Sequence, residues 1–234
     1  MIVGIHQPYF IPYIGYWQLI NAVDLFAIAD NYNYIKGGWI NRNRVLEGET
    51  IHYYNLEIDH ISQNRYICDH QLKPIDKEMK LRQLDYYYHH APYRNQGIEL
   101  MDRMFSFEGT NLADFLYHSI RHVCDYLQIG TKIVRTSDYK QDPALRCKDR
   151  IFDYCLQMGA DTYYNMIGGT CLYSFEDFRE HGLKLAFLEP IPIPYPQNGK
   201  EFVFGLSILD MIMQNSVDEI QEQLKSYRLI TESR

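Results

Sequence analysis

The chain has 234 residues, of which 46% are hydrophobic and 23% are charged. This balance is typical of a folded domain and excludes a disordered chain. The formal net charge of -7 disfavours nonspecific binding to nucleic acid, because the phosphate backbone repels an acidic surface. The five cysteines are odd in number and widely spaced, which argues against a disulfide framework and against a paired-cysteine zinc site.

No apolar run approaches the ~18 residues that a membrane-spanning helix requires. The N-terminus leads directly into an apolar run with no basic segment before it, so we expect no signal peptide. Together with the unpaired cysteines, these features predict a cytoplasmic protein. They predict neither a membrane span nor a nucleic-acid partner.

The first unit of the chain is a strand, a polar and aromatic loop, a helix and a second strand. Residues 1–5 and 25–29 are short apolar runs of the kind that form buried strands. Between them, Pro8 and Pro12 stiffen the loop, and Pro12 suits the first position of a helix. Gly15 falls in the first turn of that helix, where it costs about 1 kcal/mol relative to alanine. The missing side chain admits either a ligand or a neighbouring core aromatic.

A turn-rich loop then leads to the run Asn41-Arg42-Asn43-Arg44. Residues 40–45 and 51–58 are predicted to be a third strand and a partner that continue the edge of the sheet. In an extended run, both asparagines lie on one face and both arginines on the other. One face suits a phosphate or a carboxylate in forked contacts, and a solvated edge strand protected by charge is the alternative.

Residues 59–128 are predicted to be a mostly helical insertion that covers the sheet or the site. Residues 59–74 are expected to form a loop, followed by helices at 76–90, 96–107 and 111–128. The last of these helices is amphipathic and has Asn111 as its expected N-cap. His118 and His122 share one face of it at a spacing that metal ligands use. No acidic residue accompanies them in sequence, so the pattern favours covering histidines and no metal site.

The second half of the chain alternates strands and helices. Strands are predicted at 131–135, 162–166 and 184–188, and helices at 143–158, 174–181, 206–214 and 217–227. Residues 189–205 begin with alternating prolines, which cannot donate to a central ladder, so this segment is predicted to be a loop or lid. No internal repeat is present, and residues 1–234 are predicted to form a single α/β domain.

Polar side chains follow four of the predicted strands at their carboxyl ends. They are His6-Gln7, Asp30-Asn31, Ser137-Asp138 and Gly168-Gly169-Thr170. In a doubly wound sheet these strand ends meet along one edge, where ligands bind. The paired glycines favour a turn whose N–H groups face an anion, and a plain tight turn is the alternative.

Several stretches of the chain carry a family likeness in sequence order. They are His6-Gln7-Pro8 with Gly15-Tyr16, Asn41-Arg42-Asn43-Arg44, Ala91-Pro92-Tyr93, Cys124-Asp125-Tyr126-Leu127, Lys132-Ile133-Val134-Arg135 with Ser137-Asp138, Gly159-Ala160-Asp161-Thr162-Tyr163, Gly168-Gly169 with Leu172-Tyr173, and Leu206-Ser207-Ile208-Leu209-Asp210. With these stretches the chain resembles the WbqC-like family over nearly its whole length. The resemblance implies a bacterial role in surface-polysaccharide (O-antigen) biosynthesis, with transfer of an amino acid or acyl group onto an amino sugar.

The sequence departs from that family at two loops that the resemblance assigns to a ligand. Asn165-Met166-Ile167 stands where members usually have Ser-Gly before the paired glycines. Ala29-Asp30-Asn31 stands where members usually have paired aspartates. These departures leave open a different substrate or a loss of activity.

A more distant resemblance concerns Tyr13-Ile14-Gly15-Tyr16. This run stands where nucleotidylyltransferases and related ligases have a His-x-Gly-His signature, whose glycine lets the nucleotide approach. The likeness implies a doubly wound, mostly parallel sheet of the nucleotidylyltransferase (HUP-like) type with a helical insertion, and ATP with Mg²⁺ as the cofactor. Both signature histidines are tyrosines here, which removes the usual cationic stabilisers of phosphoryl transfer.

The favoured hypothesis is an enzyme that activates a small carboxylate as an adenylate and passes it to an amine on a nucleotide sugar. His6, as acid–base residue or phosphate ligand, and Asp138 are its predicted catalytic residues. The predicted substrate- and nucleotide-binding residues are Gln7, Tyr9, Gly15, Tyr16, Asp30, Asn41, Arg42, Asn43, Arg44, Arg135, Ser137, Gly168, Gly169 and Thr170. A thioester-dependent acyltransferase and a non-catalytic binder of nucleotide sugars or glycan precursors are the alternatives.

Overall fold

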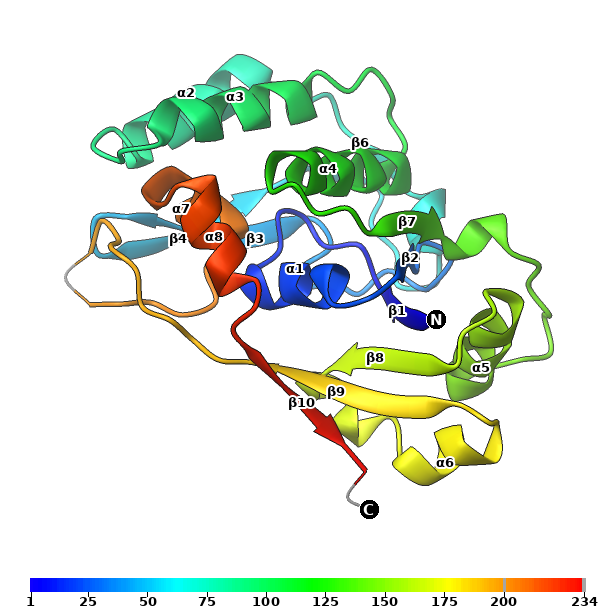
Figure 1. The fold of residues 1–234 in the computed structure, drawn as a ribbon. Helices are drawn as coiled ribbons and strands as arrows, with labels where there is room; N and C mark the ends of the chain where they lie inside the picture. Colours follow the sequence, from blue (N-terminus) through cyan, green and yellow to red (C-terminus); the bar gives the residue numbers. More distant parts are fainter. Residues whose placement is uncertain (200, 233–234) are drawn as a thin grey trace.

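A computed structural model describes residues 1–199 and 201–232 of the chain. Its centre is a six-stranded sheet in which β10 runs antiparallel to its neighbour at one edge and the other strands run parallel (Figure 1). In spatial order the strands are β10 (Tyr227–Thr231), β9 (Lys184–Pro190), β8 (Thr162–Met166), β1 (Ile2–His6), β2 (Leu25–Ile28) and β7 (Lys132–Arg135). The predicted α/β fold with a mostly parallel sheet is therefore confirmed.

The order of the strands reverses between β1 and β8. From β1 the chain builds outward through β2 to β7, and it then returns to the other side of β1 to build β8 and β9. At such a point the connections leave on opposite sides of the sheet, so a crevice opens beyond the carboxyl ends of β1 and β8. The four predicted polar strand ends belong to the adjacent strands β8, β1, β2 and β7, and they do lie along one edge.

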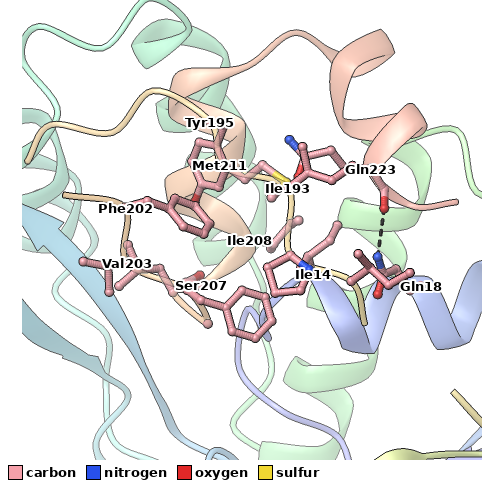
Figure 2. Close-up of a pocket in the computed structure, with 15 residues that line it drawn as sticks. Ile14, Gln18, Ile193, Tyr195, Phe202, Val203, Ser207, Ile208, Met211 and Gln223 are labelled. Carbon is pink, nitrogen blue, oxygen red and sulfur yellow. Dashed lines mark hydrogen bonds between the residues drawn. The ribbon is translucent and has the colours of Figure 1, made fainter. Parts of the chain in front are cut away.

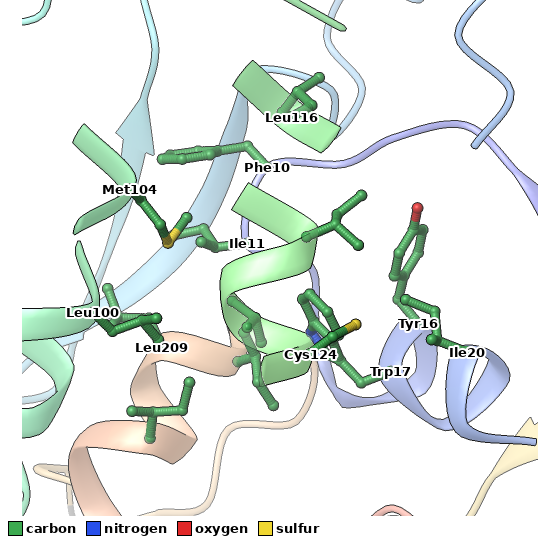
Figure 3. Close-up of a cluster of buried hydrophobic side chains, with 14 of the residues drawn as sticks. Phe10, Ile11, Tyr16, Trp17, Ile20, Leu100, Met104, Leu116, Cys124 and Leu209 are labelled. Carbon is green, nitrogen blue, oxygen red and sulfur yellow. The ribbon is translucent and has the colours of Figure 1, made fainter. Parts of the chain in front are cut away.

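Helices pack on both faces of the sheet (Figure 1). The larger layer contains α1 (Ile14–Asn21), α2 (Lys77–Tyr87), α3 (Arg94–Phe105), α4 (Leu112–Tyr126), α7 (Ile208–Gln214) and α8 (Val217–Gln223), and the smaller layer contains α5 (Cys147–Gln157) and α6 (Phe175–Glu180). Phe10, Tyr16 and Trp17 are fully buried in the larger core (Figure 3). Phe152 and Phe178 pack edge to face in the smaller one.

The α4 helix shows how the sequence specifies the larger layer. The side chain of Asn111 caps the helix by accepting a hydrogen bond from the Asp114 N–H at 3.1 Å. Every residue on the predicted apolar face is buried, including Phe115, Ile120 and Val123. With 15 residues, α4 is also the longest helix in the described part of the chain. No helix described there is long and apolar enough to cross a membrane.

The prediction that residues 40–45 and 51–58 extend the central sheet is wrong. β3 (Arg42–Glu47) and β4 (Thr50–Asn55) form a separate antiparallel hairpin. The position beside β2 is occupied by β7, so the hairpin buries apolar side chains such as Tyr54 in the larger core instead. A second short pair consists of β5 (Ile58–Asp59) and β6 (Gln71–Leu72). All of it except Ile58 lies in the segment 59–74 predicted to be a loop.

The C-terminal region differs from its prediction as well. The helix predicted over 217–227 ends earlier, because α8 stops at Gln223 and the chain turns into β10. β10 covers the outer edge of β9, and their pairing extends to Pro190. The described residues from 191 to 207 form neither helix nor strand, and Lys200 of the predicted loop 189–205 lies outside the described residues.

Candidate functional site

Two cavities meet in the crevice beyond the ends of β1 and β8. One has a volume of about 410 Å³ and the other of about 700 Å³, and each is large enough for a small-molecule ligand. His6, Tyr9, Met166 and Gly168 line both cavities. We call the smaller cavity, which Tyr13, Trp39, Arg44 and Phe204 also line, the narrow half of the cleft. The larger cavity, which Gln7, Tyr32, Lys148 and Gly169 also line, is the wide half.

His6 ends β1 at the junction of the two halves. Its Nδ1 lies 3.0 Å from the carbonyl oxygen of Gln7, and because a carbonyl only accepts, we assign the imidazole proton to Nδ1. The neutral ring then has a free electron pair on Nε2. The ring edges of Tyr9 and Tyr16 hold the imidazole, with centroids 4.9 Å and 5.2 Å away. Burial lowers the pKa of His6 below 6.5, against the opposing effect of the Gln7 hydrogen bond, so the ring is neutral at pH 7.

Gly15 is explained by a neighbouring aromatic ring. A Cβ atom at this position would lie 2.6 Å from the ring of Tyr13, which occupies the space that a side chain would need. This is the core-aromatic alternative, and Tyr13, not Gly15, lines the narrow half. Burial raises the pKa of Tyr13 to about 12, so its phenol is protonated. Tyr16 donates its hydroxyl to the Gln7 carbonyl at 3.1 Å, which fixes the loop that carries His6.

Arg44 is the one charged residue that lines the narrow half among the described residues. Its Nη2 donates to the carbonyl of Gly205 at 2.7 Å, and its guanidinium lies 5.6 Å from the ring centroid of Trp39. Its Nε is buried and has no hydrogen-bond partner. No described carboxylate forms an ion pair with it. Asn43 also lines this half, but its amide donates to the Phe10 carbonyl at 3.0 Å and fastens β3 to the loop.

The other polar residues of this run and Arg135 lie outside both halves. Arg42 donates to the Gly38 carbonyl at 3.2 Å and stacks on Tyr53. Asn41 donates to the Leu56 carbonyl at 2.9 Å. Arg135 forms an ion pair with Asp114 on α4 at 2.5 Å.

The polar residues after β2 and β7 bond to one another instead of lining the cleft. Asp30, with 1% of its surface exposed, accepts hydrogen bonds from the Ser137 N–H at 3.1 Å and the Ser137 hydroxyl at 2.7 Å. Asn31 accepts from the Thr136 hydroxyl at 2.7 Å. Asp138 accepts from the backbone N–H of Arg135 at 3.3 Å. These contacts satisfy the side chains internally.

The glycine turn after β8 does reach the cleft. Gly168 lines both halves, and a Cβ atom there would meet nothing within 4 Å. Gly169 lines the wide half, but its Cβ position lies 2.4 Å from the Asn165 amide nitrogen, so a side chain is sterically excluded. Thr170 donates its hydroxyl back to the Ile167 carbonyl at 3.0 Å.

Several residues that line the cleft are not among the predicted site residues. In the narrow half they include Tyr13, Trp39 and Phe204, and in the wide half Tyr32 and Lys148. Phe204 lies about 200 positions from His6 along the chain, and no spacing rule connects them. The weak signal that was available is the position of Tyr32 directly after the polar end of β2.

The lining of the cleft contains no acidic side chain among the described residues. The described part of the chain also holds no cluster of three or more His, Cys, Asp or Glu residues that suits a metal ion. The rings of His118 and His122 do lie together, with centroids 4.3 Å apart, on the exposed side of α4.

A third and much smaller cavity lies beneath the proline-rich segment (Figure 2). Its volume of about 20 Å³ is enough for one water molecule. Gln18, with 1% of its surface exposed, donates to the carbonyls of Gln223 at 2.8 Å and Ser226 at 2.9 Å. Its Oε1 has no partner and is a suitable acceptor for such a water. The cavity is too small for a substrate.

Comparisons with known proteins place these features in a family context. A family model described as the WbqC-like protein family matches residues 7–222, a range that contains every predicted site residue except His6. The chain is also 25% identical, over 217 residues, to a protein of Mycobacterium tuberculosis (strain ATCC 25618 / H37Rv) described as uncharacterized protein Rv1507c. That alignment covers 90% of this chain and 92% of the relative. No solved structure matches.

Proposed function

Because the chain belongs to the WbqC-like protein family and has a neutral histidine in the crevice of its sheet, we propose that it is a transferase. It moves a small acyl or aminoacyl group onto the amine of an amino sugar, such as a nucleotide sugar, in surface-polysaccharide biosynthesis. The observation that carries the proposal is the state of His6. Its Nδ1 proton is held by the Gln7 carbonyl and burial lowers its pKa, so Nε2 is available as a base.

His6 acts as the general base of the transfer. As the amine nitrogen forms its bond to the acyl carbon, an N–H proton moves to Nε2 of His6. The bond from the acyl carbon to the leaving group breaks, and its electron pair stays on that group. His6 then returns the proton to the leaving group, so the side chain ends the cycle unchanged. The edge contacts of Tyr9 and Tyr16 limit rotation of the imidazole during both transfers.

Arg44 supplies the positive charge that an activated donor needs. Adenylates carry a phosphate next to the reacting carbonyl, and acyl-carrying thiols of the coenzyme A type carry phosphates further away. The buried and unpartnered Nε of Arg44 can donate to such an oxygen, and a charge-assisted hydrogen bond of this kind is among the stronger ones in proteins.

The nucleotidylyltransferase (HUP-like) type of sheet belongs to the same proposal. The reversal of strand order beside β1 and the crevice at that point support it. Tyr13 and Tyr16, which stand in place of the signature histidines, line the narrow half but carry no positive charge. Arg44 is the cation that replaces them there.

ATP with Mg²⁺ fits this cleft only in part. The guanidinium of Arg44 suits a phosphate group. Proteins usually hold Mg²⁺ through one or two carboxylates in addition to the phosphates of the substrate, and no Asp or Glu among the described residues lines either half. The donor set therefore does not fit a protein-bound Mg²⁺, and no step of the proposal passes through one.

Product analysis by mass spectrometry tests the transfer. The purified protein is incubated with an amino sugar nucleotide and with either ATP plus amino acids or an acyl thioester. We expect an amide-linked product from one of the two donors. Release of pyrophosphate identifies the adenylate route, and release of a thiol identifies the thioester route. Tight binding of the amino sugar with no product from any donor would support the non-catalytic alternative and contradict a transferase.

The pH dependence of the rate tests the role of His6. Its pKa lies below 6.5, so the imidazole is neutral above that value and becomes protonated as the pH falls. We expect a constant kcat/KM from pH 7 to 8 and a tenfold loss for each pH unit below the His6 pKa. A rate that does not change between pH 5 and pH 8 contradicts general-base catalysis by His6.

A further inference from the structure

We infer that the two halves of the cleft bind two different ligands at the same time. The narrow half takes an aromatic anion, and the wide half takes a second anion that carries the attacking amine. This inference rests on the proposed function and deepens it, because it assigns the donor and the acceptor to opposite sides of His6.

The chemistry of the narrow half suits an aromatic anion. Trp39, Tyr13 and Phe204 provide its aromatic surface, and the rings of Tyr13 and Phe204 meet edge to face with centroids 6.1 Å apart. Arg44 lies over Trp39 and has a buried Nε without a partner. A nucleoside phosphate offers a planar base to such rings and an anion to the guanidinium. The narrow half therefore suits the nucleotide part of the donor.

The wide half has its own unused hydrogen-bond donors. The hydroxyl of Tyr32 is buried and has no partner. The guanidinium carbon of Arg150 lies 4.1 Å from the centroid of the Tyr32 ring. The Nε of Arg150 is also buried and has no hydrogen-bond partner. Arg150 donates its Nη2 to the Asn31 carbonyl at 3.1 Å, and no described carboxylate pairs with it. Arg150 is not itself a lining residue, so of these buried donors the Tyr32 hydroxyl is the one that belongs to the wall of the wide half. A buried donor without a hydrogen-bond partner is destabilising, so this position suits an anionic group of the second ligand.

A second cation faces the wide half from α5. Lys148 lines it, and its ammonium forms an ion pair with Asp177 of α6 at 2.6 Å. Asp177 itself is not among the lining residues, so on this side the ligand meets the lysine of the ion pair and not the carboxylate. A phosphate of the acceptor therefore finds the Tyr32 hydroxyl and the Lys148 ammonium within one cavity.

The shared lining lets the two ligands react directly. His6, Tyr9, Met166 and Gly168 border both halves, and Gly168 adds no side chain to that border, since even a Cβ atom there would meet nothing within 4 Å. An amine bound in the wide half and an acyl group bound in the narrow half meet beside His6. Transfer then takes place in a ternary complex without a covalent enzyme intermediate.

Isothermal titration calorimetry of the full chain tests this arrangement with two probes. AMP represents the aromatic anion, and glucosamine 1-phosphate represents the anionic amine. We expect each probe to bind alone, and saturation with one to change the Kd of the other less than about threefold. Arg44→Met is expected to raise the Kd of AMP about 10-fold or more and to leave that of glucosamine 1-phosphate unchanged. Tyr32→Phe is expected to raise only the Kd of glucosamine 1-phosphate, by about 5-fold.

Matched variants control for general effects. Arg103→Met removes an exposed arginine that pairs with Glu99 on α3 and lines neither half, and Tyr86→Phe removes an exposed hydroxyl on α2, so neither is expected to change either Kd. Arg44→Lys keeps the positive charge but lacks Nε. It is expected to fold like the wild type and to raise the Kd of AMP about 5-fold. This variant keeps the test possible if Arg44→Met does not fold.

Three results overturn the two-ligand arrangement. The first is competition between the two probes. The second is that Arg44→Met and Tyr32→Phe each raise the Kd of both probes equally. The third is that either probe fails to bind at millimolar concentration. None of them requires turnover, so they are separate from the test of the transferase. Competing probes together with His6-dependent transfer contradict only the arrangement, and simultaneous binding with no product from any donor contradicts only the transferase.

Discussion

The two pairs of strand ends at the edge of the sheet look alike in sequence and differ in the folded chain. β1 and β8 lead into His6 and Gly168, which line an open cleft. β2 and β7 lead into Asp30 and Ser137, whose side chains bond to each other and do not line the cleft. Both pairs consist of polar or small residues that follow short apolar runs. Residue type at a strand end therefore does not decide which end binds a ligand.

Strand order explains the difference. β2 and β7 follow one another on the same side of β1, so the segments after them lie together and their polar groups meet. β1 and β8 stand on the two sides of the reversal, where the following segments diverge and leave room for a ligand. Where the segments that follow two adjacent strands diverge, the polar side chains at the strand ends face a ligand. Where these segments run together, the polar side chains form hydrogen bonds with each other.

Substitution of His6 should have the largest effect on turnover. We expect His6→Ala to lower turnover by about 10²–10⁴-fold, because the general base is lost. The variant loses the Gln7 hydrogen bond and the ring contacts with Tyr9 and Tyr16, so the unfolding free energy should fall by about 1–2 kcal/mol. Steady-state kinetics and urea denaturation of the same preparation measure both quantities.

His70 is the matched control for His6. It is fully buried, its Nδ1 lies 2.7 Å from the Tyr66 carbonyl, and its Nε2 accepts from the Ser62 N–H at 3.2 Å. Both ring nitrogens of His70 are thus satisfied within the fold. His70→Ala should lower the unfolding free energy by about 2–3 kcal/mol and leave turnover per folded molecule unchanged. Equal effects of the two substitutions on turnover would remove His6 from the centre of the site.

Substitution of Asp30 should give the reverse pattern to that of His6. Asp30→Ala removes a buried acceptor that serves the exposed Ser137 and lies 3.3 Å from the hydroxyl of the fully buried Thr136, so we expect a loss of about 1–3 kcal/mol in unfolding free energy. The affinity for AMP should be unchanged in the molecules that remain folded. Urea denaturation and calorimetry measure the two effects.

Asp138→Ala, at the end of the neighbouring strand β7, is the control for Asp30. Asp138 is exposed and accepts one backbone hydrogen bond at 3.3 Å, so its loss should cost less than about 1 kcal/mol. A stable Asp30→Ala protein that no longer binds AMP would show that the Asp30 carboxylate contacts the ligand after all. It would also break the distinction between the open and the closed strand ends.

Most of the fold could be predicted because its signals are local. The buried run of β2 and the amphipathic face of α4 follow from periodicity within a few residues. The hairpin of β3 and β4 was misplaced because its alternation fits any sheet, and strand order is not encoded locally. β10 was missed because Tyr227 and the residues after it gain their strand conformation from the distant edge of β9.

The candidate site could be predicted only in part for the same reason. His6, Gln7 and Gly168 were found because they sit at strand ends. The contribution of Trp39 and Phe204 depends on where the hairpin and the proline-rich segment pack, which is a property of the tertiary structure. Polar strand ends predicted the correct edge of the sheet but not the part of it that stays open.

The adjacent glycines after β8 allow a finer test of where the cleft begins. Gly169→Ala places a methyl group 2.4 Å from the Asn165 amide nitrogen, so we expect a loss of about 1–3 kcal/mol in unfolding free energy. Gly168→Ala meets open space and should change stability by less than about 0.5 kcal/mol. Thermal or urea unfolding of the two variants measures both changes in unfolding free energy. Equal losses would mean that Gly168 is packed and that the two halves are not continuous.

The smallest expected effect concerns a second closed network, around Asp210 on α7. Asp210 is fully buried and accepts hydrogen bonds from the hydroxyls of Tyr88 at 3.0 Å and Tyr195 at 2.7 Å. Burial raises the pKa of Asp210 from 3.8 to about 6, although both hydrogen bonds act in the opposite direction. Tyr195 belongs to the proline-rich segment, so this carboxyl group helps to fasten that segment to α7.

A raised carboxyl pKa makes the folded state less stable as the pH rises. The folded protein binds more protons than the unfolded chain between the two pKa values, so the contribution of Asp210 is complete below about pH 4 and is lost as the pH passes through 6. From pH 5 to pH 8 the contribution of Asp210 to the unfolding free energy falls by about 1 kcal/mol. His6 has the opposite sign, because its pKa is lowered and its contribution is lost as the pH falls below 6.5. A comparison of two proteins that both contain His6 removes that contribution.

Asp210→Asn therefore tests whether the hydrogen-bond network around Asp210 affects stability and not ligand binding. We expect the unfolding free energy of the wild type to fall by about 1 kcal/mol more than that of Asp210→Asn between pH 5 and pH 8, as measured by urea denaturation. The Kd of AMP should be the same for both proteins at each pH, because Asp210 does not line the cleft. Parallel stability curves would mean that the carboxyl group titrates as it does in water. A pH-dependent difference in AMP affinity would instead link the proline-rich segment, through Tyr195, to the Phe204 wall of the narrow half.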